Sequence, residues 1–153
     1  MRHALAPGIG DPEGLDLRDC ATQRNLSQAG RRQAREAGAT LKSLGIVDAE
    51  VFSSAWCRCI DTATGLELGP VTVLDSLNSF FRNQGDSAAQ THDLGRWIEA
   101  RLSGPASKPA VLVTHQVNIS GLIGRYAASG EAFILGIDED ELRVLDSLQF
   151  MTP

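Results

Sequence analysis

Two histidines and two arginines of this sequence lie where they could act together on a bound anion. Arg2 and His3 are adjacent near the beginning of the sequence, and His115 directly follows the apolar run AVLVT. Arg58 falls in the first turn of a predicted helix, where a cation opposes the helix dipole unless an anion lies between them. Guanidinium groups and a helix N-terminus bind tetrahedral anions through paired N–H donors and a favourable dipole. The spacing therefore predicts a phosphate pocket.

In such a pocket a neutral imidazole can attack phosphorus, while the positive groups stabilise charge on the equatorial oxygens. We expect this phosphoryl transfer to need no metal and no other cofactor, because no cluster of acidic metal ligands accompanies the histidines in the sequence. The C-R-C spacing of Cys57 and Cys59 is also too tight for the usual zinc site. From spacing alone, the alternative is that these histidines and arginines are structural or solvent-exposed residues, which is the commoner case.

Strands and helices that alternate along the chain must position these side chains. Short apolar or β-branched runs predict strands at 49–52, 71–77 and 110–114. Apolar spacing predicts helices at 27–44, capped by Ser27 and stopped at Gly45, and also at 57–66, 92–102 and 117–128. The runs AFILGI at 132–137 and LRVLDSL at 142–148 predict edge strands that are antiparallel to their neighbours.

This alternation predicts a three-layer α/β/α fold with a mostly parallel central sheet. Ligands of such sheets bind beyond the carboxyl ends of the strands. His115 and the segment that leads to Arg58 both follow predicted strands. If Arg2 and His3 also end a strand, all of these groups converge at one edge of the sheet.

Length and composition exclude several other classes of protein. The 153 residues are sufficient for one domain, which we expect to span 1–153. The net charge of −5 argues against a nucleic-acid partner, which usually requires a basic surplus. No transmembrane segment and no signal peptide is visible in the sequence, and the oligomeric state is not indicated.

Four motifs resemble those of the histidine phosphatase superfamily, and they occur in the family's order over most of the chain. They are MRH at 1–3, DCATQRNLSQAG at 19–30, SSAWCRCIDTA at 53–63 and VLVTHQVN at 111–118. Together with LNSFFR at 77–82, the second and third motifs resemble a bacterial branch of small, often exported family members. The resemblance implies a phosphoglycerate mutase-like fold and a phosphatase that acts on a small phosphorylated substrate or a phosphoprotein.

The resemblance also implies roles for individual residues. His3 is the implied nucleophile, which becomes a phosphohistidine. Arg2, Arg58 and His115 are implied to bind the transferring phosphoryl group, and Arg24 to add to the same pocket. Gln116 and Asn118, just beyond the second histidine, are expected to line the substrate side.

The sequence departs from the family pattern at the proton donor. The glutamate that many members use falls on Ser79 here, and the aspartate that others place after the second histidine falls on Gln116. A hydroxyl is a poor acid near pH 7. Either Asp75 or Asp86 supplies the proton, or the substrate has a leaving group that needs little protonation. We therefore expect weak activity on simple alkyl phosphates.

A second departure concerns the beginning of the chain. Family members carry an apolar strand before the R-H pair, where only Met1 stands here. We therefore expect a truncated first strand and a natural product that starts upstream. An upstream signal peptide would make the protein exported or periplasmic, and otherwise a cytoplasmic location is expected. In an oxidising compartment, a disulfide from Cys20 to Cys57 or Cys59 would pin the polar loop against the arginine helix.

Two alternatives to a phosphatase remain at this stage. A non-catalytic phosphate-binding or interaction domain of the same fold would explain the missing acid, but it would have no need of a nucleophilic imidazole. A phosphomutase is disfavoured, because the mutases of this family are longer chains that carry the acidic proton donor and additional insertions that bind the substrate.

Overall fold

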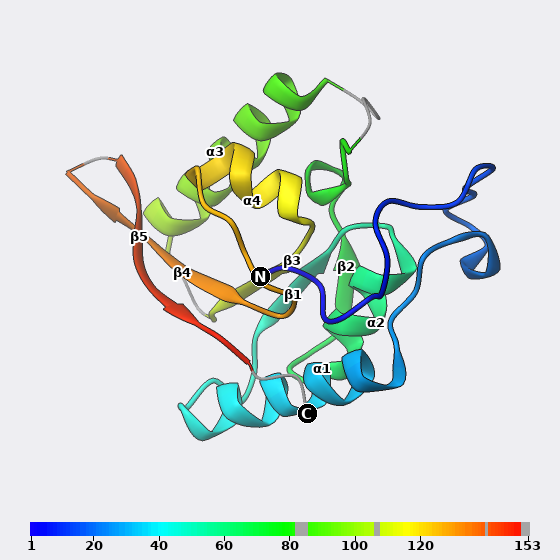
Figure 1. Cartoon of the computed structure of the whole chain (residues 1–153). Coiled ribbons are helices and arrows are strands. Elements are labelled where there is room, and N and C mark those ends of the chain that lie inside the picture. The colour runs from blue at the N-terminus through cyan, green and yellow to red at the C-terminus, as the bar shows by residue number, and fades with distance from the viewer. Residues whose placement is uncertain (82–85, 106–107, 140, 151–153) are drawn as a thin grey trace.

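The computed structural model describes residues 1–81, 86–105, 108–139 and 141–150 (Figure 1). Four helices and five strands are present in this part of the chain. In chain order the elements are η1 (Cys20–Thr22), α1 (Gln28–Ser43), β1 (Glu50–Ser53), α2 (Cys57–Gly65), β2 (Val71–Val73), η2 (Asp75–Leu77), α3 (Ser87–Ser103), β3 (Ala110–Val113), α4 (Gln116–Ile123), β4 (Ala132–Asp138) and β5 (Glu141–Leu148).

The central sheet is parallel and has the strand order β2-β1-β3. Figure 1 shows α1 and α2 on one side of this sheet and α3 and α4 on the other. The strands β4 and β5 pair antiparallel with each other in a separate two-stranded sheet. The predicted three-layer α/β fold is thus confirmed, and the two C-terminal strands form a hairpin of their own.

Alternating side chains of β1 divide the apolar core between the two helical layers. Val51 is buried in a cluster with Ala37, Leu41 and Ala63 from α1 and α2. The adjacent Phe52 packs against the cluster formed by Leu77, Leu94 and Ile98 from η2 and α3. Successive residues of a strand point to opposite faces of its sheet, so a short strand with apolar residues on both faces must be covered on both sides.

The segment before His3 lies along the end of β3. Arg2 forms a parallel bridge with Thr114, and the amide of Thr114 donates to the Met1 carbonyl over 2.9 Å. On its other side, the Arg2 amide donates to the Glu131 carbonyl, also over 2.9 Å. Figure 1 shows this end of the chain in the middle of the molecule, between the two sheets. His3 is therefore placed by backbone pairing to the end of β3.

The strand predicted at 71–77 ends at Val73, because the amides of Leu77 and Asn78 donate back to the carbonyls of Leu74 and Asp75 and form η2 instead.

Two helices also differ from their predicted bounds. The helix α4 ends at Ile123, because Gly124 takes a left-handed conformation with φ 65° that stops it before the predicted end. The helix α3 begins at Ser87, earlier than predicted, because the Asp86 side chain accepts from the amides of Ala88 and Ala89 and caps it. Over the described residues, no helix has the length and apolar character to cross a membrane.

Candidate active site

The two histidine rings meet at the carboxyl edge of the central sheet. His115 directly follows β3, and the short segment paired to the end of β3 carries His3. The ring centroids lie 5.5 Å apart, and the ring planes are inclined by 67°. Both side chains are buried. The helix α2 begins beyond the end of β1 and brings Arg58 to the same place.

Backbone contacts hold the His3 ring in one tautomer. The Nδ1 atom lies 2.8 Å from the Ala4 carbonyl oxygen, which can only accept, so Nδ1 carries the proton of the neutral ring and Nε2 keeps a lone pair. The amide of Ala4 donates to Thr62 Oγ1 over 3.0 Å, which fixes the next residue. Burial is the main cause that lowers the pKa of His3 to about 3. The hydrogen bond to Ala4 acts to raise this pKa, and the positive charges of Arg58 and Arg2 lower it further. The ring is therefore neutral at pH 7 with Nε2 unprotonated.

The His115 ring is also neutral and contacts a different set of side chains. A guanidinium nitrogen of Arg58 lies 3.3 Å from Nδ1, and the Ser54 hydroxyl lies 2.8 Å from Nε2. A guanidinium only donates, so Nδ1 accepts and the Nε2 hydrogen is directed to Ser54. Burial, followed by the charge of Arg58, lowers the pKa of His115 well below its ordinary value. In this arrangement His115 holds Arg58 in place.

Arg58 is buried and makes a paired salt bridge with a carboxylate. Its two terminal nitrogens lie 2.6 and 3.1 Å from the two carboxylate oxygens of Asp11. Its Nε atom is buried and has no hydrogen-bond partner among the described residues. A guanidinium fork that grips a carboxylate in this way also matches the geometry of a phosphate.

Asp11 is the site residue that sequence reasoning missed. Its carboxylate also accepts from the Arg24 amide and from the Trp56 indole N–H, each over 3.1 Å. Burial acts to raise the pKa of Asp11, but the hydrogen bonds and charge of Arg58 outweigh it and hold the pKa below its ordinary value. Asp11 belongs to the polar loop of residues 7–19, and no sequence pattern indicates that its side chain turns inward. The salt bridge from Asp11 to Arg58 joins this loop to α2, and the disulfide described below joins the segment that follows it.

The other two arginines are partly engaged by backbone carbonyls. Arg2 donates to the Ala127 carbonyl over 2.8 Å, and its guanidinium carbon lies 5.9 Å from the centre of the Tyr126 ring. Arg24 donates to the Gly10 carbonyl over 2.7 Å and to the Ala6 carbonyl. Among the described residues neither arginine has a hydrogen bond to His3, but the charges of both lower the pKa of that histidine. The charges of Arg2, Arg24 and Arg58 thus all act on the His3 ring.

Of the three residues expected on the substrate side, Ser79 lines the cavity beside Asp11, whereas the Asn118 and Gln116 side chains bond to the backbone. Ser79 lines a cavity next to Asp11, and its hydroxyl accepts from the Phe81 amide over 3.3 Å. Asn118 is buried and donates to the Asn78 carbonyl over 2.8 Å. Gln116 turns to the loop after α4 instead, where its side chain accepts from the Ala127 amide over 2.8 Å.

Neither aspartate that the sequence offers as a proton donor has a contact with the site. Asp86 caps α3 through bonds to two amides of its first turn. Asp75 is exposed in η2, where it accepts from the Asn78 side chain. Asp11 is in direct contact with Arg58, and this salt bridge holds the pKa of its carboxyl below the ordinary value and keeps it ionised at pH 7.

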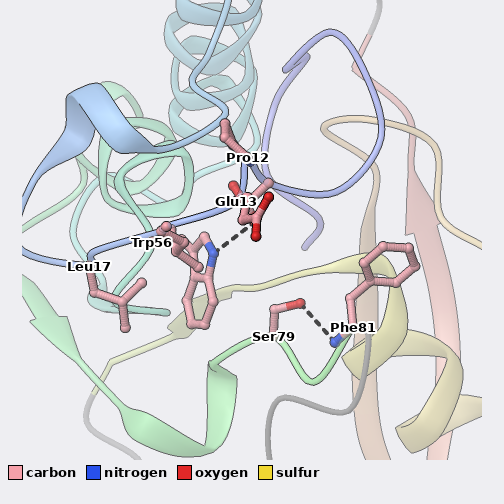
Figure 2. A pocket seen from close by; sticks show the side chains of 9 residues that line it. Pro12, Glu13, Leu17, Trp56, Ser79 and Phe81 are labelled. Carbon is pink, nitrogen blue, oxygen red and sulfur yellow. Dashed lines mark hydrogen bonds between the residues drawn. The ribbon is translucent and has the colours of Figure 1, made fainter.

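The cavity beside Asp11 has a volume of about 670 Å³ and lies between the 11–17 loop and the segment at 79–81. Figure 2 shows Pro12 and Glu13 above, Ser79 and Phe81 to the lower right, and Trp56 and Leu17 to the left. Its lining mixes acidic and apolar side chains. The cavity is large enough for the leaving group of a small phosphorylated compound.

A disulfide joins this loop region to the arginine helix. Cys20 is bonded to Cys57, the first residue of α2, with their Cα atoms 5.7 Å apart. Of the two partners that the sequence leaves open for Cys20, the structure selects Cys57. Cys59 is a buried free thiol whose pKa is raised to about 12 by burial.

Comparisons with known proteins identify the family and the fold of the chain. The sequence model described as histidine phosphatase superfamily (branch 1) matches residues 17–106. No curated protein gives a significant match to the sequence. A structure of the protein histidine phosphatase SixA complexed with tungstate is similar with a TM-score of 0.71 at 18% identity, covering 97% of this chain and 93% of that one.

Two further solved structures share the fold. One is a protein of Mycobacterium tuberculosis, with a TM-score of 0.69 at 19% identity over 99% of this chain and 95% of that one. The other is a mutant phosphoserine phosphatase from Entamoeba histolytica in complex with phosphoserine, with a TM-score of 0.66 at 13% identity over 95% of this chain and 93% of that one. These similarities extend the shared architecture beyond the matched segment to almost the whole chain.

Proposed function

This chain belongs to the histidine phosphatase superfamily, and from that premise we propose that it is a metal-independent phosphatase that works through a phosphohistidine at His3. The observation that carries the proposal is the state of the His3 ring. Its Nδ1 hydrogen is bound to the Ala4 carbonyl, and its Nε2 lone pair is free to attack. Burial lowers the pKa of this imidazole to about 3, so the ring is unprotonated at neutral pH, as a nucleophile must be.

The proposed reaction has two steps. Nε2 of His3 forms a bond to phosphorus while the bond from phosphorus to the leaving oxygen breaks, and the leaving group carries the electron pair away. A water molecule then attacks the phosphohistidine, releases inorganic phosphate and returns the electron pair to Nε2. The three arginines around the ring stabilise the charge on the equatorial oxygens in both steps.

We propose a substrate whose leaving group needs little protonation. In the resemblance to the family, the glutamate that serves as the acid falls on Ser79, which lines the cavity beside Asp11. The Asp11 carboxylate is held ionised by Arg58. Aryl phosphates, phosphoramidates such as phosphohistidine, acyl phosphates and pyrophosphate meet this condition. Among the structural relatives, one is named a protein histidine phosphatase and another a phosphoserine phosphatase. Small phosphorylated compounds and phosphoproteins are therefore both substrates to test.

A second candidate is a phosphate-binding domain of the same fold that does not turn over. The salt bridge between Asp11 and Arg58 favours it, because this contact already neutralises the central cation of the pocket. The free Nε2 of His3 favours the enzyme, since a binding domain gains nothing from a nucleophile there.

Hydrolysis of p-nitrophenyl phosphate separates the two candidates. We expect turnover by the wild type in the presence of a chelator, and a loss of kcat/KM of about a thousandfold or more in His3→Ala. The matched control is His92→Ala, which removes an exposed imidazole on α3 and should keep wild-type activity. Circular dichroism checks that both variants fold. Turnover that survives in His3→Ala, or is absent from the wild type, would contradict the proposed mechanism.

A further inference from the structure

Four N–H donors converge on the Asp11 carboxylate. Two come from the Arg58 guanidinium at 2.6 and 3.1 Å, and one each from the Trp56 indole and the Arg24 amide at 3.1 Å. The Asp11 side chain is 11% exposed and that of Arg58 is 3% exposed. Four N–H groups donate to the two oxygens of this carboxylate, so Asp11 occupies the position that a bound anion would otherwise occupy.

The position of this carboxylate matters because Arg58 also contacts His115, whose ring lies beside that of His3. A terminal nitrogen of Arg58 lies 3.3 Å from His115, and the His115 ring lies 5.5 Å from the His3 ring. The phosphoryl group that His3 attacks must therefore lie within reach of the Arg58 fork. A phosphate dianion and the Asp11 carboxylate cannot both be gripped by the fork, since they are like charges that compete for the same two donors.

We propose that Asp11 is a specificity-determining residue: its carboxylate occupies Arg58 in the free protein and leaves it when the phosphoryl group binds. The inference rests on the proposed function and adds an exchange step to it. The exchange lowers the affinity for every anion by the free energy that the Asp11 contacts contribute. A doubly charged phosphoryl group, with more oxygens to offer Arg58, overcomes this competition better than a singly charged ester does.

The loop around Asp11 is built in a way that permits the exchange. Gly8, Gly10 and Gly14 all have positive φ, between 71° and 92°, so the backbone on both sides of Asp11 follows turns that favour glycine. The cavity of about 670 Å³ begins at the Asp11 side chain and offers it a place to move into. The Cys20–Cys57 disulfide anchors the following segment, so the carboxylate can leave Arg58 while the loop stays attached to α2.

Binding of inorganic phosphate tests the exchange without any turnover. Isothermal titration calorimetry should give a Kd for Asp11→Asn that is about 10- to 100-fold lower than that of the wild type, because a neutral amide competes poorly for Arg58. The matched control is Asp16→Asn in the same loop, whose carboxylate pairs with the exposed Arg18 and not with the site. Its Kd should equal that of the wild type.

Asp11→Asn could fail to fold, because it leaves the buried Arg58 without its carboxylate partner, so a second variant is needed. Trp56→Phe removes one donor from Asp11 but keeps Asp11 and Arg58, so it should lower the Kd for phosphate several-fold. Tighter binding in either folded variant supports the exchange. An unchanged or higher Kd in the folded variants, or no phosphate binding by any of the proteins, overturns it.

The outcome is distinguishable from a failure of the proposed function. Tighter binding in Asp11→Asn without aryl phosphate turnover in the wild type would overturn the phosphatase mechanism and keep the exchange. Turnover in the wild type with an unchanged Kd in Asp11→Asn would keep the phosphatase mechanism and overturn the exchange.

Discussion

The imidazole of His3 lies edge-on to that of His115, with ring centroids 5.5 Å apart. Each ring is held in one tautomer by a partner that does not change its protonation near neutral pH. The Ala4 carbonyl holds His3, and the Arg58 guanidinium holds His115. Two neutral, buried imidazoles at the start of the arginine helix form the centre of the site, and the predictions below follow from their burial and their contacts.

The stability of the protein should depend on pH through these two histidines. Burial lowers the pKa of both, to about 3 for His3, so between about pH 3 and 6.5 the unfolded chain binds protons that the native protein does not. The free energy of unfolding should therefore rise with pH through this window and fall as the pH decreases from about 6.5. Urea unfolding at pH 7, 6, 5 and 4 measures it.

The contribution of His3 can be separated with a variant. In His3→Ala the decrease in the free energy of unfolding between pH 6.5 and 4 should be smaller than in the wild type, because one buried neutral imidazole is gone. His92→Ala, which removes an exposed ring, should follow the wild-type curve. Identical pH dependence in the wild type and His3→Ala would show that His3 is not held neutral in the folded protein.

The rate of hydrolysis should depend steeply on the leaving group. Ser79 cannot protonate a departing alkoxide near pH 7, and the Asp11 carboxylate is ionised. We expect kcat/KM to fall by at least about a hundredfold from p-nitrophenyl phosphate to a simple alkyl phosphate such as glycerol phosphate. Steady-state kinetics on a series of phosphomonoesters measures the slope, and equal rates on aryl and alkyl esters would mean that a general acid has been missed.

The close approach of α1 to the segment after His3 should make Gly30 intolerant of a side chain. A Cβ atom at Gly30 would collide with the Leu5 carbonyl oxygen, which also accepts from the Ser27 amide over 3.1 Å. Gly30→Ala should lower the free energy of unfolding by about 1–3 kcal/mol. It should also reduce kcat, because Leu5 is two residues from His3, the proposed nucleophile.

The control for Gly30→Ala is the same substitution at Gly95, in the helix α3, which does not pack against the segment after His3 in the contacts of the described residues. A Cβ atom there would meet only Leu122, at an ordinary contact distance of 3.7 Å. Gly95→Ala in the middle of α3 should raise the free energy of unfolding by about 0.5–1 kcal/mol. If both alanine variants changed stability equally, the contact between α1 and Leu5 would not be tight.

The Cys20–Cys57 disulfide should stabilise the protein and the loop that carries Asp11. In the chain-entropy account, a bond that closes a loop of 37 residues contributes about 3–4 kcal/mol to the free energy of unfolding. The double variant Cys20→Ser, Cys57→Ser should lose this amount, and a reducing agent should lower the melting temperature of the wild type but not of the variant. A melting temperature of the wild type that does not respond to reduction would contradict this assignment.

The sequence was sufficient to predict the elements that depend on local patterns. Ser27 caps α1 as expected, because capping depends on one side chain and the next few amides. The apolar run at 110–113 forms β3, since a strand buried on both faces must be apolar throughout. The end of α4 was predicted too late, because a helical pattern continues past Gly124 although the backbone there is left-handed.

Features that depend on tertiary contacts could not be predicted. Cys57 and Cys59 are two residues apart, and only the orientation of α2 decides that Cys57 faces the loop while Cys59 is buried beside His115. Asp11 lies in a loop without periodicity, so nothing local distinguishes it from the solvent-exposed Glu13. The pairing of β4 with β5 in a sheet of their own likewise depends on where the hairpin packs, and both strands have the composition of edge strands.

Trapping the phosphorylated enzyme tests the central claim most directly. The wild type is mixed with p-nitrophenyl phosphate, quenched in alkali within one turnover, digested and examined by mass spectrometry for a phosphate bound through nitrogen. The proposed mechanism predicts an alkali-stable, acid-labile phosphate on the peptide that contains His3, and none in His3→Ala. Turnover that proceeds with no phosphate on His3, or with the phosphate on another residue, would contradict it.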